Sequence, residues 1–229
     1  MRIGKSALVL GSLQQQKRLE VIANNIANAS TAAYKRDDSH FSDFVFQTTY
    51  TNFGPGAIKS TENPLDVAIQ GDGYLRVQSE EGEVYTRAGN LRLNGENTLV
   101  TQEGWPVLGK GGPIQVKDSR IRIDPSGQIF DYDDNEENLV DTLDVVTFRK
   151  DTALMKVRNG YVKPVDSGQE ATPLENVDVQ QGALEGANFN VVEEMTRMVD
   201  TMRAFEAYQK ASQTQSELDS QLISKLGNM

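Results

Sequence analysis

The sequence predicts an α+β protein: a β-rich central domain, either a sandwich or a partly open barrel, carried by two paired terminal helices. Helical periodicity is strongest at the two ends of the 229-residue chain, and the middle consists of short alternating runs broken by glycine turns. Because neither end can bury its apolar stripe alone, we expect the two helices to pair as a coiled-coil-like stem. The expected domains are a helical assembly domain (1–33 and 188–229), a connector (34–64) and a β-rich outer domain (65–187).

Composition excludes several classes of function. The chain has no cysteine and no apolar run long enough to cross a membrane, so thiol chemistry and membrane insertion are excluded. The net charge is −10, yet residues 1–40 carry six basic and three acidic residues, and residues 190–229 carry four basic and six acidic ones. The middle is therefore strongly acidic, and we expect no nucleic-acid partner. The opposite signs of the two ends favour their association with each other or with neighbouring copies.

The first predicted helix covers residues 3–29. Its apolar side chains recur at helical steps of three and four residues, at Ile3, Ala7 and Leu10 and then at Leu19, Ile22, Ile26 and Ala29. A polar turn at 14–18 separates these two stretches, so the helix would be marginal alone. The basic residues and apolar run at 2–10 superficially resemble a secretory signal. Because the polar turn interrupts that run, we expect no cleaved signal peptide.

The centre of the chain carries strand and turn signals. The connector contains apolar anchors at 41 and 44–46 and breaks at Gly54-Pro55-Gly56. The runs 66–69 and 74–77 flank Gly71-Asp72-Gly73 and predict a hairpin-like pair. Further alternating runs follow at 84–86, 90–93, 98–101, 106–108, 120–124, 128–130 and 143–148. Many short strands with glycine-rich turns are typical of a sandwich or barrel.

The last predicted helix covers residues 191–226. Asn190 is a suitable N-cap, and Glu193 follows three residues later, as in a capping box. A heptad seam follows at Val191, Met195, Met198, Met202 and Phe205, and it resumes on a shifted stripe at Leu218 and Leu222. Such a helix would be about 54 Å long, which exceeds what one small β-domain can cover. The methionines could pack within the molecule or, because methionine adapts to varied surroundings, meet other subunits.

Residues with catalytic or metal-binding potential form no convincing site. His40 is the only histidine, and a solvated surface role is the simplest interpretation. In the acidic stretch 131–137, Asp131, Asp133 and Asn135 match the first ligands of an EF-hand, but Glu136 replaces the required glycine. A solvated acidic hairpin is the preferred interpretation and a weak cation site the alternative. We therefore expect neither an enzyme nor a cofactor or metal.

Several motifs together resemble the bacterial flagellar rod and hook protein family. The N-terminal signature is matched by 21–31 and 34–36, with Ala33 where the family usually has glycine. The segments 63–74, 85–91 and 99–101 match the central elements, and 188–195 and 203–206 match the C-terminal signature. From the helix stripes and these signatures, the expected assembly interface comprises Ile3, Leu10, Leu19, Ile22, Asn24, Asn25, Ile26, Asn28, Val191, Met195, Met198, Met202, Phe205, Leu218 and Leu222.

The resemblance implies a structural subunit of the periplasmic rod in the flagellar basal body, the drive shaft between motor and hook. It implies related rod subunits and further copies of the chain as partners, and passage through the flagellar export apparatus. It also implies terminal segments that are disordered in the monomer and become helical on polymerisation. The length and the short connector at 41–62 are most like a proximal rod subunit, with a distal rod subunit as the alternative.

Outside the family, the alternative is a carbohydrate-binding β-domain protein that uses Trp105 and nearby tyrosines. The position of Trp105 between Gly104 and Pro106 favours a hydrophobic role in packing a turn.

Overall fold

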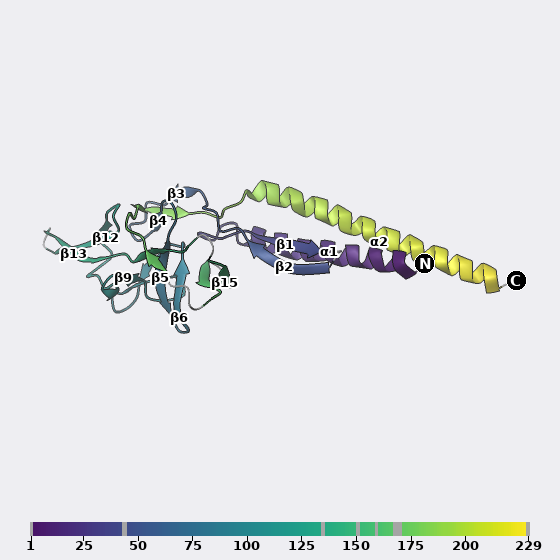
Figure 1. Ribbon diagram of the computed structural model, residues 1–229. Coiled ribbons are helices and arrows are strands. Elements are labelled where there is room, and N and C mark those ends of the chain that lie inside the picture. The colour runs from purple at the N-terminus through teal and green to yellow at the C-terminus, as the bar shows by residue number, and fades with distance from the viewer. Residues whose placement is uncertain are drawn as a thin grey trace. The chain divides into compact units, whose positions relative to one another are not determined.

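The computed structural model describes residues 2–42, 45–133, 136–149, 152–158, 160–166 and 171–227. The chain forms two compact units (Figure 1). The helical unit consists of Met1–Ala29, Arg36–Phe53 and Phe189–Met229, and the β unit consists of Ser30–Lys35 and Gly54–Asn188. Residues 36–53, which lie within the predicted connector, thus join the helical unit.

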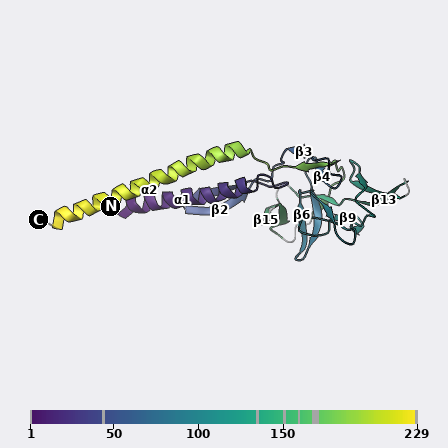
Figure 2. The same ribbon diagram turned by 180° about the vertical axis from the view of Figure 1, so that it is seen from behind.

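Two long helices dominate the helical unit. α1 (Arg2–Ala27) and α2 (Val191–Gly227) pack along each other, as the views from both sides show (Figures 1 and 2). The predicted pairing of the terminal helices is therefore confirmed. α2 begins where the sequence predicts, because the side-chain oxygen of Asn190 accepts a hydrogen bond from the N–H of Val192 at 2.9 Å. At the end of α1, the Asn28 side-chain amide donates to the Asn24 carbonyl at 2.9 Å.

A β-hairpin packs against α1 within the same unit. β1 (Asp37–Ser42) pairs antiparallel with β2 (Val45–Thr51), with an irregularity between His40 and Phe41. The rings of Phe41 and Phe46 meet edge to face at 5.8 Å. Arg18 lies 5.2 Å from the Phe41 ring, and Lys17 lies 5.5 Å from the Phe46 ring. The polar turn of α1 therefore places cations over the aromatic side chains of the hairpin, where cation–π attraction favours them.

The largest sheet of the β unit is antiparallel and has six strands. Its spatial order is β15 (Leu154–Arg158), β16 (Tyr161–Pro164), β6 (Gly82–Thr86), β5 (Tyr74–Ser79), β14 (Val145–Thr147) and β17 (Thr172–Pro173). A three-stranded sheet follows the order β11 (Ile121–Ile123), β12 (Gln128–Asp133) and β13 (Glu136–Thr142). The alternating burial of β5 and β11 shows that each sheet turns one face to the core.

Four strand pairs complete the β unit. They are β3 (Ile58–Ser60) with β19 (Ala183–Glu185), β4 (Val67–Ile69) with β18 (Val179–Gln181), β7 (Arg92–Leu93) with β8 (Leu99–Val100), and β9 (Leu108–Gly109) with β10 (Gly112–Pro113). The predicted β-rich central domain is confirmed, in the form of several small antiparallel sheets. Their buried side chains form one apolar core, which includes Val67, Ile69, Leu75, Val77, Leu99, Val107, Ile129 and Leu143.

The predicted hairpin around Gly71-Asp72-Gly73 is wrong. β4 pairs with β18, and β5 pairs with β6 and β14, so this turn carries the chain from one sheet to another. Gly71 has a φ of +83°, which glycine adopts without strain. A Cβ atom at Gly73 would lie 2.9 Å from the Val145 side chain. The glycines therefore allow a tight turn that carries the chain from one sheet to the other. Such a turn has the same residue pattern as the turn of a β-hairpin.

Candidate functional site

The side chains of α2 divide into an inner and an outer face. Apart from Ala204 and Ser216, the less exposed positions recur at alternating steps of three and four residues, the spacing of a coiled-coil seam: Val191, Glu194, Met198, Thr201, Phe205, Tyr208, Ser212, Gln215 and Asp219. Because α2 packs along α1, this inner face is turned to α1. Many of its residues are polar, so the pairing of the helices depends on hydrogen bonds as well as on apolar contact.

Asn25 and Glu194 form the buried polar centre of this helix pair. Asn25 is fully buried, and its side-chain amide donates to the Glu194 carboxylate at 2.8 Å and to the Asp37 carbonyl at 2.8 Å. Its side-chain oxygen accepts a hydrogen bond from the Asp37 N–H at 3.0 Å. The Nε atom of Arg36 lies 3.4 Å from the Glu194 carboxylate. A single asparagine of the N-terminal signature thus joins α1, β1 and α2.

Gly11 lets the two helices approach closely near the other end of α1. Gly11 is buried, and a Cβ atom built on it would lie 2.5 Å from a ring carbon of Tyr208. Only glycine fits beside the ring in this arrangement. Because Tyr208 belongs to the inner face of α2, this contact and the Asn25–Glu194 bond fix the pairing at two points.

We expect Gly11→Val to destabilise the helix pair by about 1–3 kcal/mol, because the added side chain must displace the Tyr208 ring. Helix propensity alone predicts the opposite sign, since valine forms helices better than glycine. Thermal unfolding of the full chain followed by far-ultraviolet circular dichroism measures the effect. Ala7→Val, at an exposed position of α1, is the control for adding valine to the helix, and it should cost only the difference in helix propensity, about 0.7 kcal/mol or less. Equal or greater stability of Gly11→Val would contradict the close contact.

The β unit contains a second buried polar centre around Glu185. Its carboxylate accepts hydrogen bonds at 2.6 Å from both Lys35 and Arg87, and at 2.8 Å from the N–H of Gly56. Arg87 also donates to the carbonyls of Gly73 and Ile69, at 2.8 and 3.1 Å. Lys35, Arg87 and Glu185 are all buried. This cluster ties together four parts of the β unit that are distant in sequence.

The electrostatics of this cluster favour the ionised carboxylate. Burial alone would raise the pKa of Glu185, but the hydrogen bond from Lys35, the charge of Arg87 and the Gly56 N–H together hold it below its ordinary value. Burial lowers the pKa of Lys35, and its contact with Glu185 only partly offsets this effect. Lys35 and Arg36 are consecutive, but Lys35 pairs with Glu185 inside the β unit and Arg36 with Glu194 inside the helical unit.

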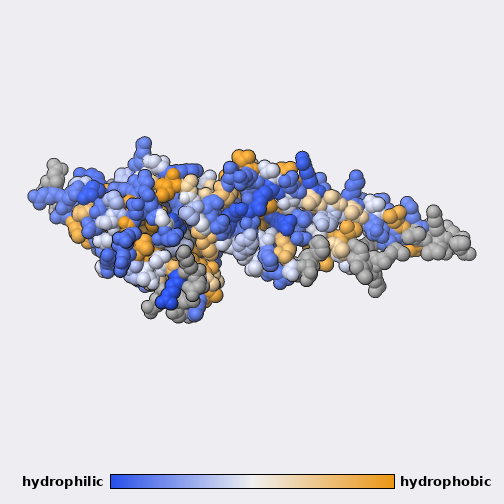
Figure 3. Space-filling view, turned by 45° about the horizontal axis from the view of Figure 1, so that its top comes forward, coloured by the Kyte–Doolittle hydropathy of each residue, from blue (hydrophilic) through white to orange (hydrophobic). Residues whose placement is uncertain are grey.

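The outer face of α2 carries an exposed apolar stripe. We call it the outer stripe: its members are exposed by 44–70% and follow helical spacing at Val192, Met195, Val199 and Met202. Orange apolar patches interrupt the blue polar surface along the helices in the surface view (Figure 3). Exposed apolar surface arranged in this way is typical of an interaction site.

The residues expected to form an interface are divided between these faces. Ile22 and Asn25 are buried, and half-buried positions are taken by Leu19, Ile26, Asn28, Val191, Met198 and Phe205. Exposed positions are taken by Leu10, Asn24, Met195, Met202 and Leu218. The side chains of Ile3 and Leu222 lie outside the described part of the structure. The sequence periodicity does not distinguish the inner face of α2 from its outer stripe, because both contain apolar residues.

A groove between α1 and α2 forms a second exposed surface, which we call the helix groove. Its volume is about 470 Å³. One wall comes from α1 and is mainly apolar, with Leu8, Val9 and Leu13 beside the single polar residue Ser12; Val9 and Leu13 are 48% and 54% exposed. The other wall is polar and comes from α2, with Gln209, Ser212, Gln213 and Ser216. The small serine side chains leave the apolar wall accessible.

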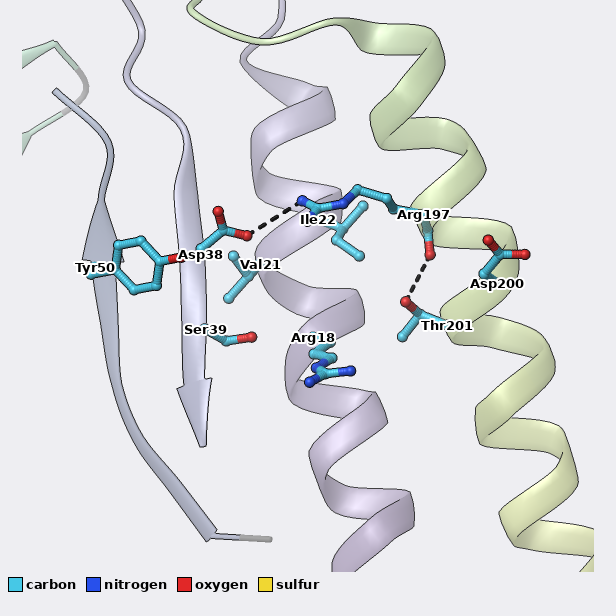
Figure 4. Close-up of a pocket in the computed structure, with 9 residues that line it drawn as sticks. All are labelled: Arg18, Val21, Ile22, Asp38, Ser39, Tyr50, Arg197, Asp200 and Thr201. Carbon is cyan, nitrogen blue, oxygen red and sulfur yellow. Dashed lines mark hydrogen bonds and ion pairs between the residues drawn. The ribbon is translucent and has the colours of Figure 1, made fainter. Parts of the chain in front are cut away.

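A polar cavity of about 390 Å³ lies where β1, α1 and α2 meet (Figure 4). Arg197 of α2 forms an ion pair with Asp38 of β1 at 3.4 Å, and the Thr201 hydroxyl donates to the Arg197 carbonyl at 2.7 Å. Val21 and Ile22 of α1 also line the cavity. The arrangement connects the hairpin to α2.

The structure places the residues that were examined for catalytic, metal-binding or sugar-binding roles. His40 is exposed on β1, and 128–133 and 136–142 form the two strands of a hairpin; residues 134–135 lie outside the described residues. Trp105 packs edge to face on Tyr161 at 4.9 Å and against the apolar core. Within the described ranges there is no cluster of three metal-ligating side chains and no helix with the length and apolar content that a membrane crossing requires.

Family comparisons match three regions of the chain. Residues 1–35 match the description "Flagella basal body rod protein", 68–131 match "Flagellar hook protein FlgE/F/G D1 domain", and 180–225 match "Flagellar basal body rod FlgEFG protein C-terminal". The chain is 33% identical to the flagellar basal-body rod protein FlgF of Mesorhizobium japonicum over 204 residues, which cover 83% of this chain and 84% of the relative. The chain belongs to the flagellar basal-body rod family.

Other members of the rod family are similarly related to it. The rod protein is 31% identical to FlgF of Caulobacter vibrioides, over 98% of its own length and 99% of the relative's. It is 30% identical to FlgG of Bacillus subtilis, over 94% and 96%. The family predicted from the sequence motifs is therefore confirmed. This rod protein is a non-enzymatic structural subunit of the flagellar basal-body rod and assembles with other rod subunits.

Sequence reasoning missed Glu185, Arg87 and Glu194 as buried polar residues. Glu194 and Arg87 lie inside the matched motifs, but no local pattern distinguishes them from solvated charges. Their partners are 98 to 169 residues away in sequence. Only the folded structure shows that residues of these motifs form the ion pairs of the two units, Arg87 with Glu185 and Arg36 with Glu194.

Proposed function

We propose that this chain is the proximal rod subunit, FlgF, and that it transmits torque from motor to hook through lateral helix contacts. The chain length and the short connector at 41–62 support this choice. The distal rod subunit, FlgG, is the alternative, since relatives of both names are about equally similar to the chain.

The observation that carries the proposal is the outer stripe. A helix of 37 residues presents Val192, Met195, Val199 and Met202 to solvent beside an inner face that is partly polar. Methionine accommodates surfaces that differ from one neighbour to the next, as the contacts of a helical assembly do. In this proposal the assembly interface comprises the exposed members of the expected set, and its buried members hold α1 and α2 in the paired form.

Ordering on assembly is part of the proposal: the helix pair of a single chain is only marginally stable, and its order is completed in the rod. The polar turn of α1 and the polar inner face of α2 make both helices weak in isolation, so neighbouring subunits would stabilise them. The cost of ordering protects the chain from premature polymerisation. The helices would then line the interior of the rod, and the β unit would face outward.

The proposed route to the rod is the flagellar export apparatus, without cleavage of a signal peptide. The polar turn at 14–18 interrupts the apolar run that such a peptide needs. The absence of cysteine suits a chain that leaves the cell interior unfolded.

Site-specific photocrosslinking in intact basal bodies tests the proposal. A photoreactive residue at Met195 or Met202 should form adducts with rod subunits, identified by mass spectrometry. The same residue at the exposed Glu80 of the β unit is the control, with few such adducts expected. Adducts with hook protein would favour the distal assignment. Normal motility of cells that lack the chain would refute a role in the rod.

A further inference from the structure

Two apolar surfaces of the helical unit are open, and one molecule cannot bring them together. The outer stripe occupies residues 192–202 of α2, and the polar wall of the helix groove occupies residues 209–216 of the same helix. At 1.5 Å per residue, the centres of these two stretches lie about 23 Å apart along the helix axis. Each surface therefore needs a second molecule as its partner.

The charges around the two surfaces have opposite sign. α1, which supplies the apolar wall of the groove, carries four basic residues and one acidic residue. Residues 191–206, which contain the outer stripe, carry two basic residues and, apart from the buried Glu194, three acidic ones at Glu193, Asp200 and Glu206. A neighbour that presented its stripe to the groove would therefore place its acidic side chains beside the basic helix, which favours this pairing over stripe against stripe.

We propose that the outer stripe of one copy docks in the helix groove of the next copy, which has the same orientation and is shifted by about 23 Å along the helix axis. The inference rests on the proposed rod function and names the surfaces that meet. Met195 and Met202 lie against Leu13 and Val9 of the neighbour. Because the two surfaces differ, the contact repeats from copy to copy and does not close into a dimer.

Cysteine crosslinking of the full chain in isolated basal bodies tests this contact. The natural sequence has no cysteine, so a disulfide reports only the positions introduced. We expect oxidation to give dimers and larger species for Met195→Cys combined with Leu13→Cys. Met202→Cys with Val9→Cys is a second pair, which serves if the first pair impairs assembly. Each single substitution alone gives no such series.

Two controls use exposed alanines of the same helices. Ala207→Cys replaces Met202→Cys, and Ala23→Cys replaces Leu13→Cys; both positions lie outside the two surfaces. Loss of the crosslinked series in the controls supports the docking. Absence of crosslinks for both test pairs in motile cells with intact rods overturns the docking but leaves the rod function in place. Absence of the unmodified chain from basal bodies overturns the rod function itself.

Discussion

Glu185→Ala should destabilise the β unit by about 3–5 kcal/mol, the usual effect of removing one partner from a buried ion pair. Lys35 and Arg87 would be left buried without the carboxylate, and the N–H of Gly56 would lose its acceptor. Urea unfolding followed by tryptophan fluorescence measures this change. Trp105 is the only tryptophan and belongs to the β unit, so its signal reports that unit.

The matched control is Glu80→Ala, which removes an exposed glutamate of the same unit and should change stability by less than about 0.5 kcal/mol. Glu185→Gln adds a test of charge. The pKa of Glu185 is lower in the folded than in the unfolded chain, so its contribution exists above its ordinary value of 4.5 and is lost as pH falls below it. The stability of the glutamine variant should therefore not show the loss on acidification that is due to protonation of Glu185. Wild-type stability of Glu185→Ala at pH 7 would disprove the role of the cluster.

Deletion of residues 191–229 should leave a soluble, folded β unit that does not enter rods. The side chains of the apolar core all come from the range 65–179, and the deletion also retains Glu185. The apolar core and the buried ionic cluster of the β unit therefore both remain. Tryptophan fluorescence should show an unchanged unfolding transition, while swimming assays of a complemented deletion strain should show loss of motility.

A milder variant distinguishes the effect of losing α2 from the effect of losing its exposed apolar side chains. Met195→Gln with Met202→Gln keeps good helix formers at both positions but makes the outer stripe polar. Helix content should therefore persist in circular dichroism, with reduced incorporation into basal bodies. Retained motility after the full deletion would contradict the assembly role of α2.

The sequence predicted the helices well because their signals are local. Asn190, the heptad steps and the capping residues lie within a few positions of one another, and the predicted ends at 3–29 and 191–226 differ from the observed bounds by two residues at most. The hairpin of β1 and β2 was not predicted, since its aromatic residues occur among polar ones. It is stabilised by cations on α1, more than twenty residues earlier.

The predicted seam of α2 illustrates what a sequence pattern omits. The most apolar stripe contains Met195 and Met202, but the face turned to α1 contains Glu194 and Thr201. Thr201 is accommodated there because its hydroxyl donates to the Arg197 carbonyl within α2, whereas Glu194 needs a distant partner, Asn25, to satisfy its carboxylate. In a chain that assembles with others, the most apolar stripe need not be the one that a single molecule buries.

The ion pairs of the neighbouring residues Lys35 and Arg36 limit where residues can be inserted into the chain. Because these consecutive residues reach Glu185 and Glu194 in different units, an insertion between them would force one of the two side chains away from its partner. The turn at Gly95 has no such restriction, since a Cβ atom placed there meets no heavy atom within 4 Å. An epitope tag or fluorescent label for following rod growth therefore belongs at that turn.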